Sequence, residues 1–140
     1  MEFVIPSVPV AQPRQRHRVV GKIVHSYTPV KHPVNAFKAA VGMAWFSSDD
    51  TATLTGPVCI DVVFVLPRPQ SMTRKTKPNP RTHHAKKPDL DNLLKSLYDG
   101  LTACGAWRDD SQICECHAIK TYASADEAAN VEVAINEIEQ

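Results

Sequence analysis

Apolar residues recur at helical spacing in two segments of the chain, and the longer segment shows the clearer pattern. Its apolar positions follow i, i+3, i+4 and i+7, which predicts an amphipathic helix over about residues 90–103. The apolar stripe consists of Leu90, Leu93, Leu94, Leu97, Tyr98 and Leu101. Asp89 follows Pro88 and is expected to be the N-cap of this helix, and Gly105 is expected to end it. A shorter stretch with the same spacing predicts a second helix over about residues 34–47.

Strand-like segments make up most of the remaining apolar sequence. Residues 58–67 form a continuous run of β-branched and other apolar residues bounded by prolines, which is typical of a central strand. Near the end of the chain, residues 112–123 and 130–138 predict two antiparallel strands joined by a short connection. Apolar and polar residues alternate in the second of these, which predicts one buried face and one exposed face.

Two further β-rich segments lie near the start of the chain. Residues 3–8 predict a strand that Pro6 restricts to a sheet edge or a strand end. Residues 18–27 predict another strand, with Gly21 as a bulge or a turn. The resulting order, β-β-α-β-α-β-β, predicts a single α+β domain over residues 1–140, in which a small mixed sheet packs with two main helices.

The length and composition agree with an ordinary globular domain. A chain of 140 residues buries enough apolar surface to fold without disulfides or a structural metal. It has no run of about 18 apolar residues, so no membrane span is expected. The first residues lack the basic start and apolar core of a secretory signal, and the four cysteines do not form a convincing disulfide framework. These features predict a cytoplasmic protein with reduced thiols.

The net charge of +1 conceals an asymmetry along the chain. Residues 1–95 carry 14 Lys and Arg against 6 Asp and Glu, whereas residues 96–140 carry 2 against 9. The basic residues cluster at 14–18 and in a proline-rich stretch at 68–87 that has almost no apolar residue. A stretch of that composition predicts a long loop. Charge alone leaves two interpretations open, a solvated surface loop or a contact surface for a polyanionic partner.

Acidic residues follow the basic loop directly. Asp89 and Asp91 suit the positive end of the helix dipole, and Asp91 can pair with Lys95 one turn further on, so a purely structural role explains each of them. Asp109 and Asp110 come just after the helix, in a turn that could bring them back toward the same region. The residues themselves therefore leave both helix capping and a metal site open.

A metal site has a physical rationale at these positions. Carboxylates about 5 Å apart repel one another by about 3 kcal/mol per pair at an effective dielectric constant of about 20, so a cluster needs a cation or protons. Oxygen ligands favour a hard cation, with Mg²⁺ the first candidate and Mn²⁺ a substitute. Acids that hold such a metal beside cations that hold phosphates are the arrangement that phosphodiester hydrolysis needs.

Three segments of the chain resemble the RusA family of Holliday junction resolvases. They are KPDLDNLLKSLYDGL at 87–101, WRDDSQI at 107–113 followed by Lys120, and the opening VPVAQPRQR at 8–16. The resemblance implies an endodeoxyribonuclease of DNA recombination and repair, common in bacteria and their prophages. It also implies a symmetric homodimer that depends on Mg²⁺. This dimer would make paired nicks across a four-way junction that leave 5′-phosphates.

The resemblance also implies roles for individual residues. Asp89, Asp91 and Asp110 become metal ligands, and Lys95 becomes the catalytic lysine. Asn92, Asp99 and Asp109 match the pattern and are expected to have supporting roles. The contacts expected for four-way or other branched DNA are Arg14, Arg16, Arg74, Lys75, Lys77, Arg81, Lys86 and Lys87. The alternative is a catalytically silent module of the same fold that binds branched DNA.

A zinc site is a less favoured alternative. Cys114, Cys116 and His117 lie close together in the sequence, and His83 and His84 could add ligands from the basic loop. Their spacing lacks the paired C-x-x-C of structural zinc sites, so half-buried thiols and loop histidines are the favoured interpretation.

Overall fold

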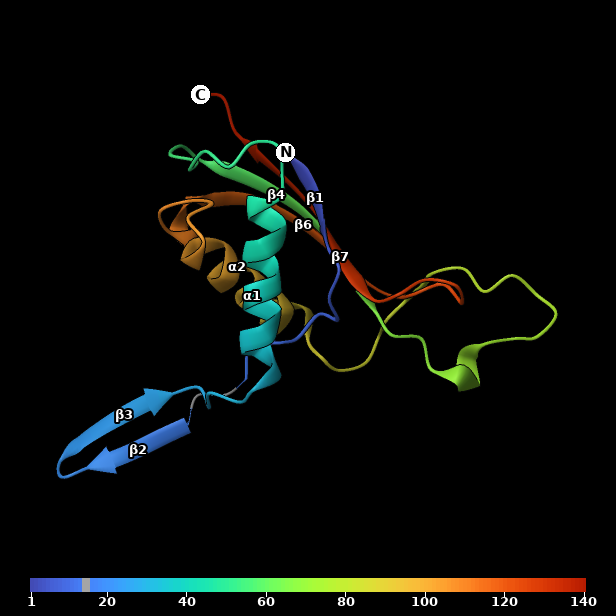
Figure 1. The fold of residues 1–140 in the computed structure, drawn as a ribbon, viewed down its shortest axis with the longest axis horizontal. Coiled ribbons are helices and arrows are strands. Elements are labelled where there is room, and N and C mark those ends of the chain that lie inside the picture. Colours follow the sequence, from blue (N-terminus) through green and yellow to red (C-terminus); the bar gives the residue numbers. More distant parts are fainter. Residues whose placement is uncertain (14–15) are drawn as a thin grey trace.

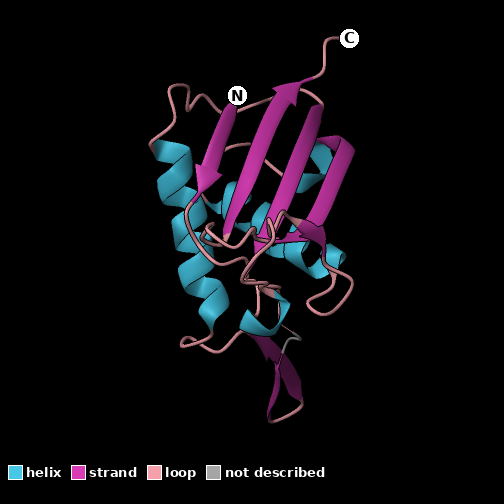
Figure 2. Cartoon of the chain, turned by 90° about the vertical axis from the view of Figure 1, so that its right-hand side faces the viewer, coloured by secondary structure: helices cyan, strands magenta, loops and turns pink. Residues whose placement is uncertain are grey.

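The computed structural model describes residues 1–13 and 16–140, apart from the side chain of Arg16. The chain forms a five-stranded mixed sheet with two helices on one face, and a separate two-stranded hairpin (Figures 1 and 2). The strands are β1 (Glu2–Ile5), β2 (Arg16–Val20), β3 (Ile23–Tyr27), β4 (Val58–Leu66), β5 (Thr82–His83), β6 (Ile113–Tyr122) and β7 (Asn130–Glu137). The helices are α1 (Pro33–Phe46) and α2 (Leu90–Ala103), with short 3₁₀ turns η1 (Gln70–Met72) and η2 (Asp110–Gln112). The small single-domain α+β fold is confirmed.

The sheet has the strand order β1-β7-β4-β6-β5. β4 is central, as its apolar sequence predicts, and it pairs in parallel with β6 and antiparallel with β7. β6 and β7 run in opposite directions, but they do not form a neighbouring pair because β4 lies between them. The alternation predicted for β7 is confirmed, since Val131, Val133 and Ile135 are buried.

Both helices begin and end within one residue of the predicted bounds. Leu93, Leu97 and Leu101 of α2 are fully buried against the sheet and α1, as their spacing requires. Gly105 follows the C-cap with φ +83°, a left-handed conformation that strongly favours glycine. No helix in the described part of the chain has both the length and the apolarity needed to cross a membrane.

The segment predicted as one strand over 18–27 is a β-hairpin. Gly21 takes φ +63° in the turn between β2 and β3, so the turn is the correct one of the two alternatives. β2 and β3 pair only with each other, and the hairpin extends away from the body of the molecule (Figure 1). At the N-terminus, the strand predicted over 3–8 stops at Ile5, because Pro6 cannot donate to a strand ladder.

Candidate active site

Asp89 occupies the N-cap position of α2, as predicted. Its backbone is extended, with φ −73° and ψ 142°, but its carboxylate accepts no capping hydrogen bond. Asp91 lies in the first turn, where one of its carboxylate oxygens accepts from the backbone N–H of Asn92 at 2.9 Å. Both side chains are exposed at the positive end of the helix dipole. The capping interpretation therefore accounts for the backbone of Asp89 but not for its carboxylate.

Lys95 does not pair with Asp91, contrary to the structural interpretation. Its ammonium lies 3.0 Å from Asp99 and 3.5 Å from Asp110. The hydrogen bond with Asp99 is the main reason that the pKa of Lys95 is raised, and Asp110 adds to the shift. Lys95 is therefore charged near neutral pH, and its ammonium connects α2 with the turn after it.

Asp109 and Asp110 have different environments. Asp109 caps η2, because its carboxylate accepts from the backbone N–H of Ser111 at 2.9 Å and Gln112 completes the capping box. The hydrogen bond with Ser111 lowers the pKa of Asp109. Asp110 makes no such cap and faces Lys95. Asp109 thus caps η2, and Asp110 is the member of the pair that lies beside the lysine.

Lys120 on β6 forms hydrogen bonds to the segment that leads into α2. Its ammonium donates to the backbone oxygens of Lys86 and Pro88, both at 2.6 Å. These two carbonyls belong to the residues just before Asp89, so Lys120 fixes where the helix starts. In the sequence, Lys120 stands out only through the family resemblance. The local feature that could have indicated its importance is a charged lysine in a half-buried part of a strand.

Two arginines anchor the basic loop to the sheet. Arg81 binds the carboxylates of Glu127 and Glu132, and Arg68 donates to the backbone oxygens of Pro80 and Ala123. Both carboxylates are hydrogen-bonded to Arg81, so in this structure Arg81 serves as an anchor rather than as an open phosphate contact.

The other predicted DNA contacts fall into two groups. Five of them are exposed and form no ion pair within the described parts of the chain: Arg74, Lys75, Lys77, Lys86 and Lys87. Arg14 lies outside the described residues, as does the side chain of Arg16.

Among the residues that the structure describes, the cysteines and histidines do not gather into a zinc site. Cys116 accepts a hydrogen bond from the hydroxyl of Tyr98 at 3.1 Å, whereas His117 lies 3.7 Å from Asp61. Adjacent residues of a strand point to opposite faces of the sheet, so Cys116 and His117 cannot share a ligand set easily. His84 instead packs against Tyr122, with ring centroids 4.2 Å apart and the ring planes tilted by 42°.

A comparison with known families covers α2, η2 and Lys120. The family model described as endodeoxyribonuclease RusA matches residues 6–136. The chain belongs to the RusA family. It is also 31% identical over 143 residues to a Bacillus subtilis (strain 168) protein named uncharacterized protein YqaN, with 99% of this chain and 96% of that protein covered. The RusA match spans the basic loop, both acidic segments and the whole sheet except β1 and the last residue of β7.

RusA nucleases generally depend on a divalent metal, which carboxylates can bind. Asp89, Asp91 and Asp110 supply only oxygen donors, which suits Mg²⁺. Within residues 1–13 and 16–140, however, no three His, Cys, Asp or Glu side chains lie close enough together to hold an ion. The donor chemistry fits, and the predicted ligand set is not preassembled in this conformation.

Proposed function

We propose that the chain is a Mg²⁺-dependent endonuclease that resolves Holliday junctions by paired, symmetric nicks leaving 5′-phosphates. The observation that carries this proposal is the pair of exposed carboxylates at the start of α2, next to the contact between Lys95 and Asp110. The carboxylate of Asp89 makes no capping hydrogen bond. The carboxylate of Asp91 forms no salt bridge with Lys95, which pairs with Asp99 instead. Both carboxylates are therefore available to bind a metal ion, and the family to which the chain belongs consists of nucleases.

The residues of the chain take complementary parts in this proposal. Asp89, Asp91 and Asp110 would hold the ion, with Mn²⁺ as a substitute for Mg²⁺. The bound ion supplies charge stabilisation at the phosphate and lowers the pKa of a water molecule. Lys95 is the catalytic lysine, and its raised pKa keeps an ammonium available to donate to a phosphoryl oxygen or the leaving oxygen.

DNA binding and assembly follow from the same proposal. The exposed cations of the basic loop, Arg74, Lys75, Lys77, Lys86 and Lys87, would contact phosphates next to the site. A two-fold junction offers two equivalent phosphates, so a symmetric homodimer presents one site to each of them. Such an enzyme would act in the cytoplasm in DNA recombination and repair, and a prophage is a plausible source of its gene.

The test is a cleavage assay on a labelled synthetic four-way junction, with Mg²⁺ and with EDTA. The wild-type protein should nick the junction only with the metal. Asp91→Asn should abolish nicking while keeping or tightening junction binding, because it removes a negative charge near the phosphates. Asp126→Asn is the matched control, since Asp126 is exposed on the loop between β6 and β7, and it should leave both properties unchanged.

Two results would contradict the proposal. Junction binding without nicking under any divalent metal would identify the chain as a catalytically silent DNA-binding module of the same fold. Cleavage by Asp91→Asn at the wild-type rate would instead show that Asp91 is structural and that the site has been misplaced.

A further inference from the structure

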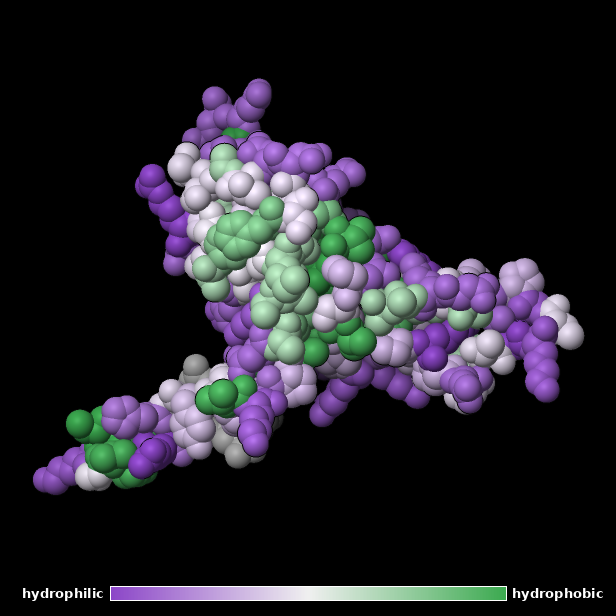
Figure 3. All heavy atoms as spheres, viewed as in Figure 1, coloured by the Kyte–Doolittle hydropathy of each residue, from purple (hydrophilic) through white to green (hydrophobic). Residues whose placement is uncertain are grey.

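Two apolar patches remain exposed on the described part of the chain. The first, the hairpin patch, consists of Val19, Val20, Ile23, Val24 and Tyr27, whose exposed fractions run from 46% to 68%. The second lies on α1 and β1, where Met43 is 72% exposed, Phe46 65% and Val4 55%. In the space-filling view, apolar atoms gather both at the hairpin and over the body of the molecule (Figure 3).

The hairpin patch covers both faces of the hairpin. Val19 is opposite Val24, and Val20 is opposite Ile23, in the register of β2 and β3. Neighbouring positions of a strand point to opposite faces, so each face of the hairpin end carries one apolar pair. A two-stranded hairpin is at best marginally stable alone in water. The exposed pairs on both faces indicate that the hairpin is completed by a partner.

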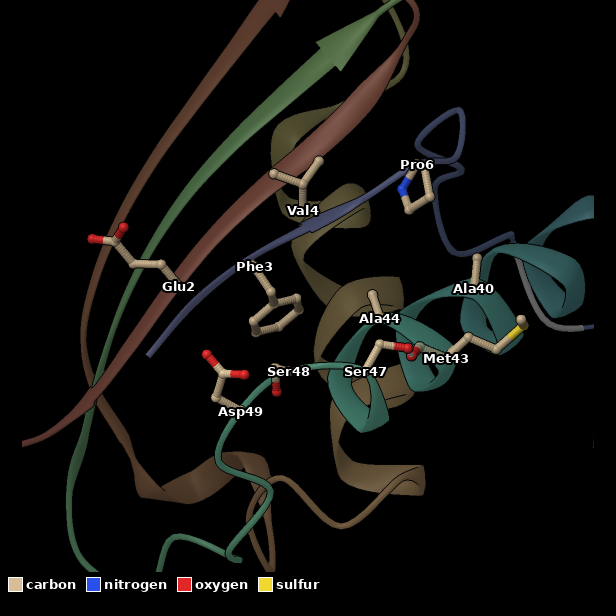
Figure 4. A pocket seen from close by; sticks show the side chains of 10 residues that line it. All are labelled: Glu2, Phe3, Val4, Pro6, Ala40, Met43, Ala44, Ser47, Ser48 and Asp49. Carbon is tan, nitrogen blue, oxygen red and sulfur yellow. Dashed lines mark hydrogen bonds between the residues drawn. The ribbon is translucent and has the colours of Figure 1, made fainter.

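The patch on the body of the molecule borders a groove between β1 and the C-terminal half of α1. The groove has a volume of about 650 Å³, and its apolar lining includes Phe3, Ala40 and Met43. Glu2 and Asp49 both lie at one end of it, and their carboxylates point apart (Figure 4). No lysine or arginine is among the residues that line it. The groove therefore combines apolar side chains with serines and has two acidic residues at one end.

The hairpin has the complementary charge. Residues 16–32 contain four lysines and arginines and no acidic residue, and Lys22 lies in the turn between the two apolar strands. Seating the apolar end of the hairpin in the groove would bring Lys22 toward Glu2 and Asp49. Apolar surface and charge therefore match between two patches of the same chain.

The hairpin does not occupy the groove of its own chain. Its base joins the N-terminus of α1, whereas the groove lies beside the C-terminal half of this helix, which is about 20 Å long. The hairpin also points away from that end of the helix (Figure 1). A second copy is consequently the occupant that brings the two patches together.

We infer that the β2–β3 hairpin of each copy docks in the β1–α1 groove of a second copy. Two-fold symmetry then closes the assembly, because each copy contributes one hairpin and one groove. This interface would build the homodimer of the proposed function. Dimerisation can be measured without DNA. The absence of this interface can therefore be distinguished from the absence of junction cleavage.

The experiment measures the mass of the chain in solution by sedimentation velocity. The wild-type chain should be a dimer. Ile23→Asp in the hairpin and Met43→Asp in the groove should each weaken dimerisation by at least about tenfold, since both place a charge in a buried apolar contact. Val30→Asp is the matched control: Val30 is 90% exposed and outside both patches, so the dimer should persist.

Mixing the two variants distinguishes the proposed pairing from others. In a mixed dimer, the intact hairpin of Met43→Asp meets the intact groove of Ile23→Asp, so the mixture should regain dimers that neither variant forms alone. A hairpin-to-hairpin interface would not recover in this way. Charge reversal gives a second measure: Lys22→Glu should weaken the dimer, and Asp49→Lys should restore it in the double variant.

Three results of the sedimentation experiments would overturn the inference. They are a wild-type chain that is monomeric at every concentration, a dimer that survives both Asp substitutions, and a mixture that does not recover. Loss of junction binding by Ile23→Asp with an unchanged dimer would also overturn it, and would show that the hairpin contacts DNA instead.

Discussion

Replacement of Arg81 by methionine tests how the basic loop is held beside the site. Arg81 forms hydrogen bonds to Glu132 at 2.9 Å with both terminal nitrogens and to Glu127 at 2.9 Å and 3.2 Å with Nε. A further contact with Glu127 involves a terminal nitrogen. The change to methionine keeps most of the length of the side chain and removes all of these bonds.

The expected loss of stability is modest, because the cluster is partly exposed. The side chains of Arg81, Glu127 and Glu132 are 35%, 22% and 40% exposed, and ion pairs of this kind contribute about 0.2–1 kcal/mol each. The hydrogen bond with Arg81 lowers the pKa of Glu127 from its usual 4.5 to about 2. Without screening, that shift would correspond to about 3 kcal/mol. Solvent screening of the partners reduces it, so we expect Arg81→Met to lower the free energy of unfolding by about 1–2 kcal/mol.

The pH dependence has a definite sign. The pKa of Glu127 is lowered in the folded state, so its contribution is complete above pH 4.5 and is lost as the pH falls toward 2. The difference in stability between wild type and Arg81→Met should therefore be largest near pH 7. It should shrink progressively below pH 4.5.

The assay is urea unfolding across this pH range, together with junction binding near pH 7. Arg74→Met is the matched control, because Arg74 lies in the same loop and forms no ion pair within the described residues. It should leave stability unchanged and weaken junction binding. A stability of Arg81→Met equal to that of wild type, or a difference that persists at low pH, would refute the anchoring role.

Three further predictions concern the site and its DNA contacts. Lys95→Ala should abolish cleavage with little change in melting temperature, since its side chain is 55% exposed; a melting temperature lowered by many degrees would indicate a structural lysine. Lys120→Met should lower the free energy of unfolding by about 2 kcal/mol, because two backbone carbonyls lose a charged donor, and unchanged urea unfolding would refute this. Junction affinity, measured by titration between about 50 and 200 mM salt, should fall steeply, and a flat dependence would exclude the basic loop as the contact surface.

The sequence by itself determined the elements of this protein that depend on local periodicity. The stripe from Leu90 to Leu101 predicted α2 with its observed bounds, and the apolar run at 58–67 predicted β4 as the central strand. These two predictions are correct because burial dictates which positions are apolar. One face of α2 is buried, and most residues of β4 are buried. The acidic and basic segments likewise identified the family before any geometry was known.

Only the tertiary structure decided which distant groups meet. β4 lies between β6 and β7, although nothing in the pattern of either strand excludes a direct pair. Lys95 pairs with Asp99 and Asp110 rather than with Asp91, because a long flexible side chain finds its partners among all the carboxylates within reach. Strand neighbours and ion pairs are set by contacts between residues far apart in the chain, and spacing along the sequence does not encode those contacts.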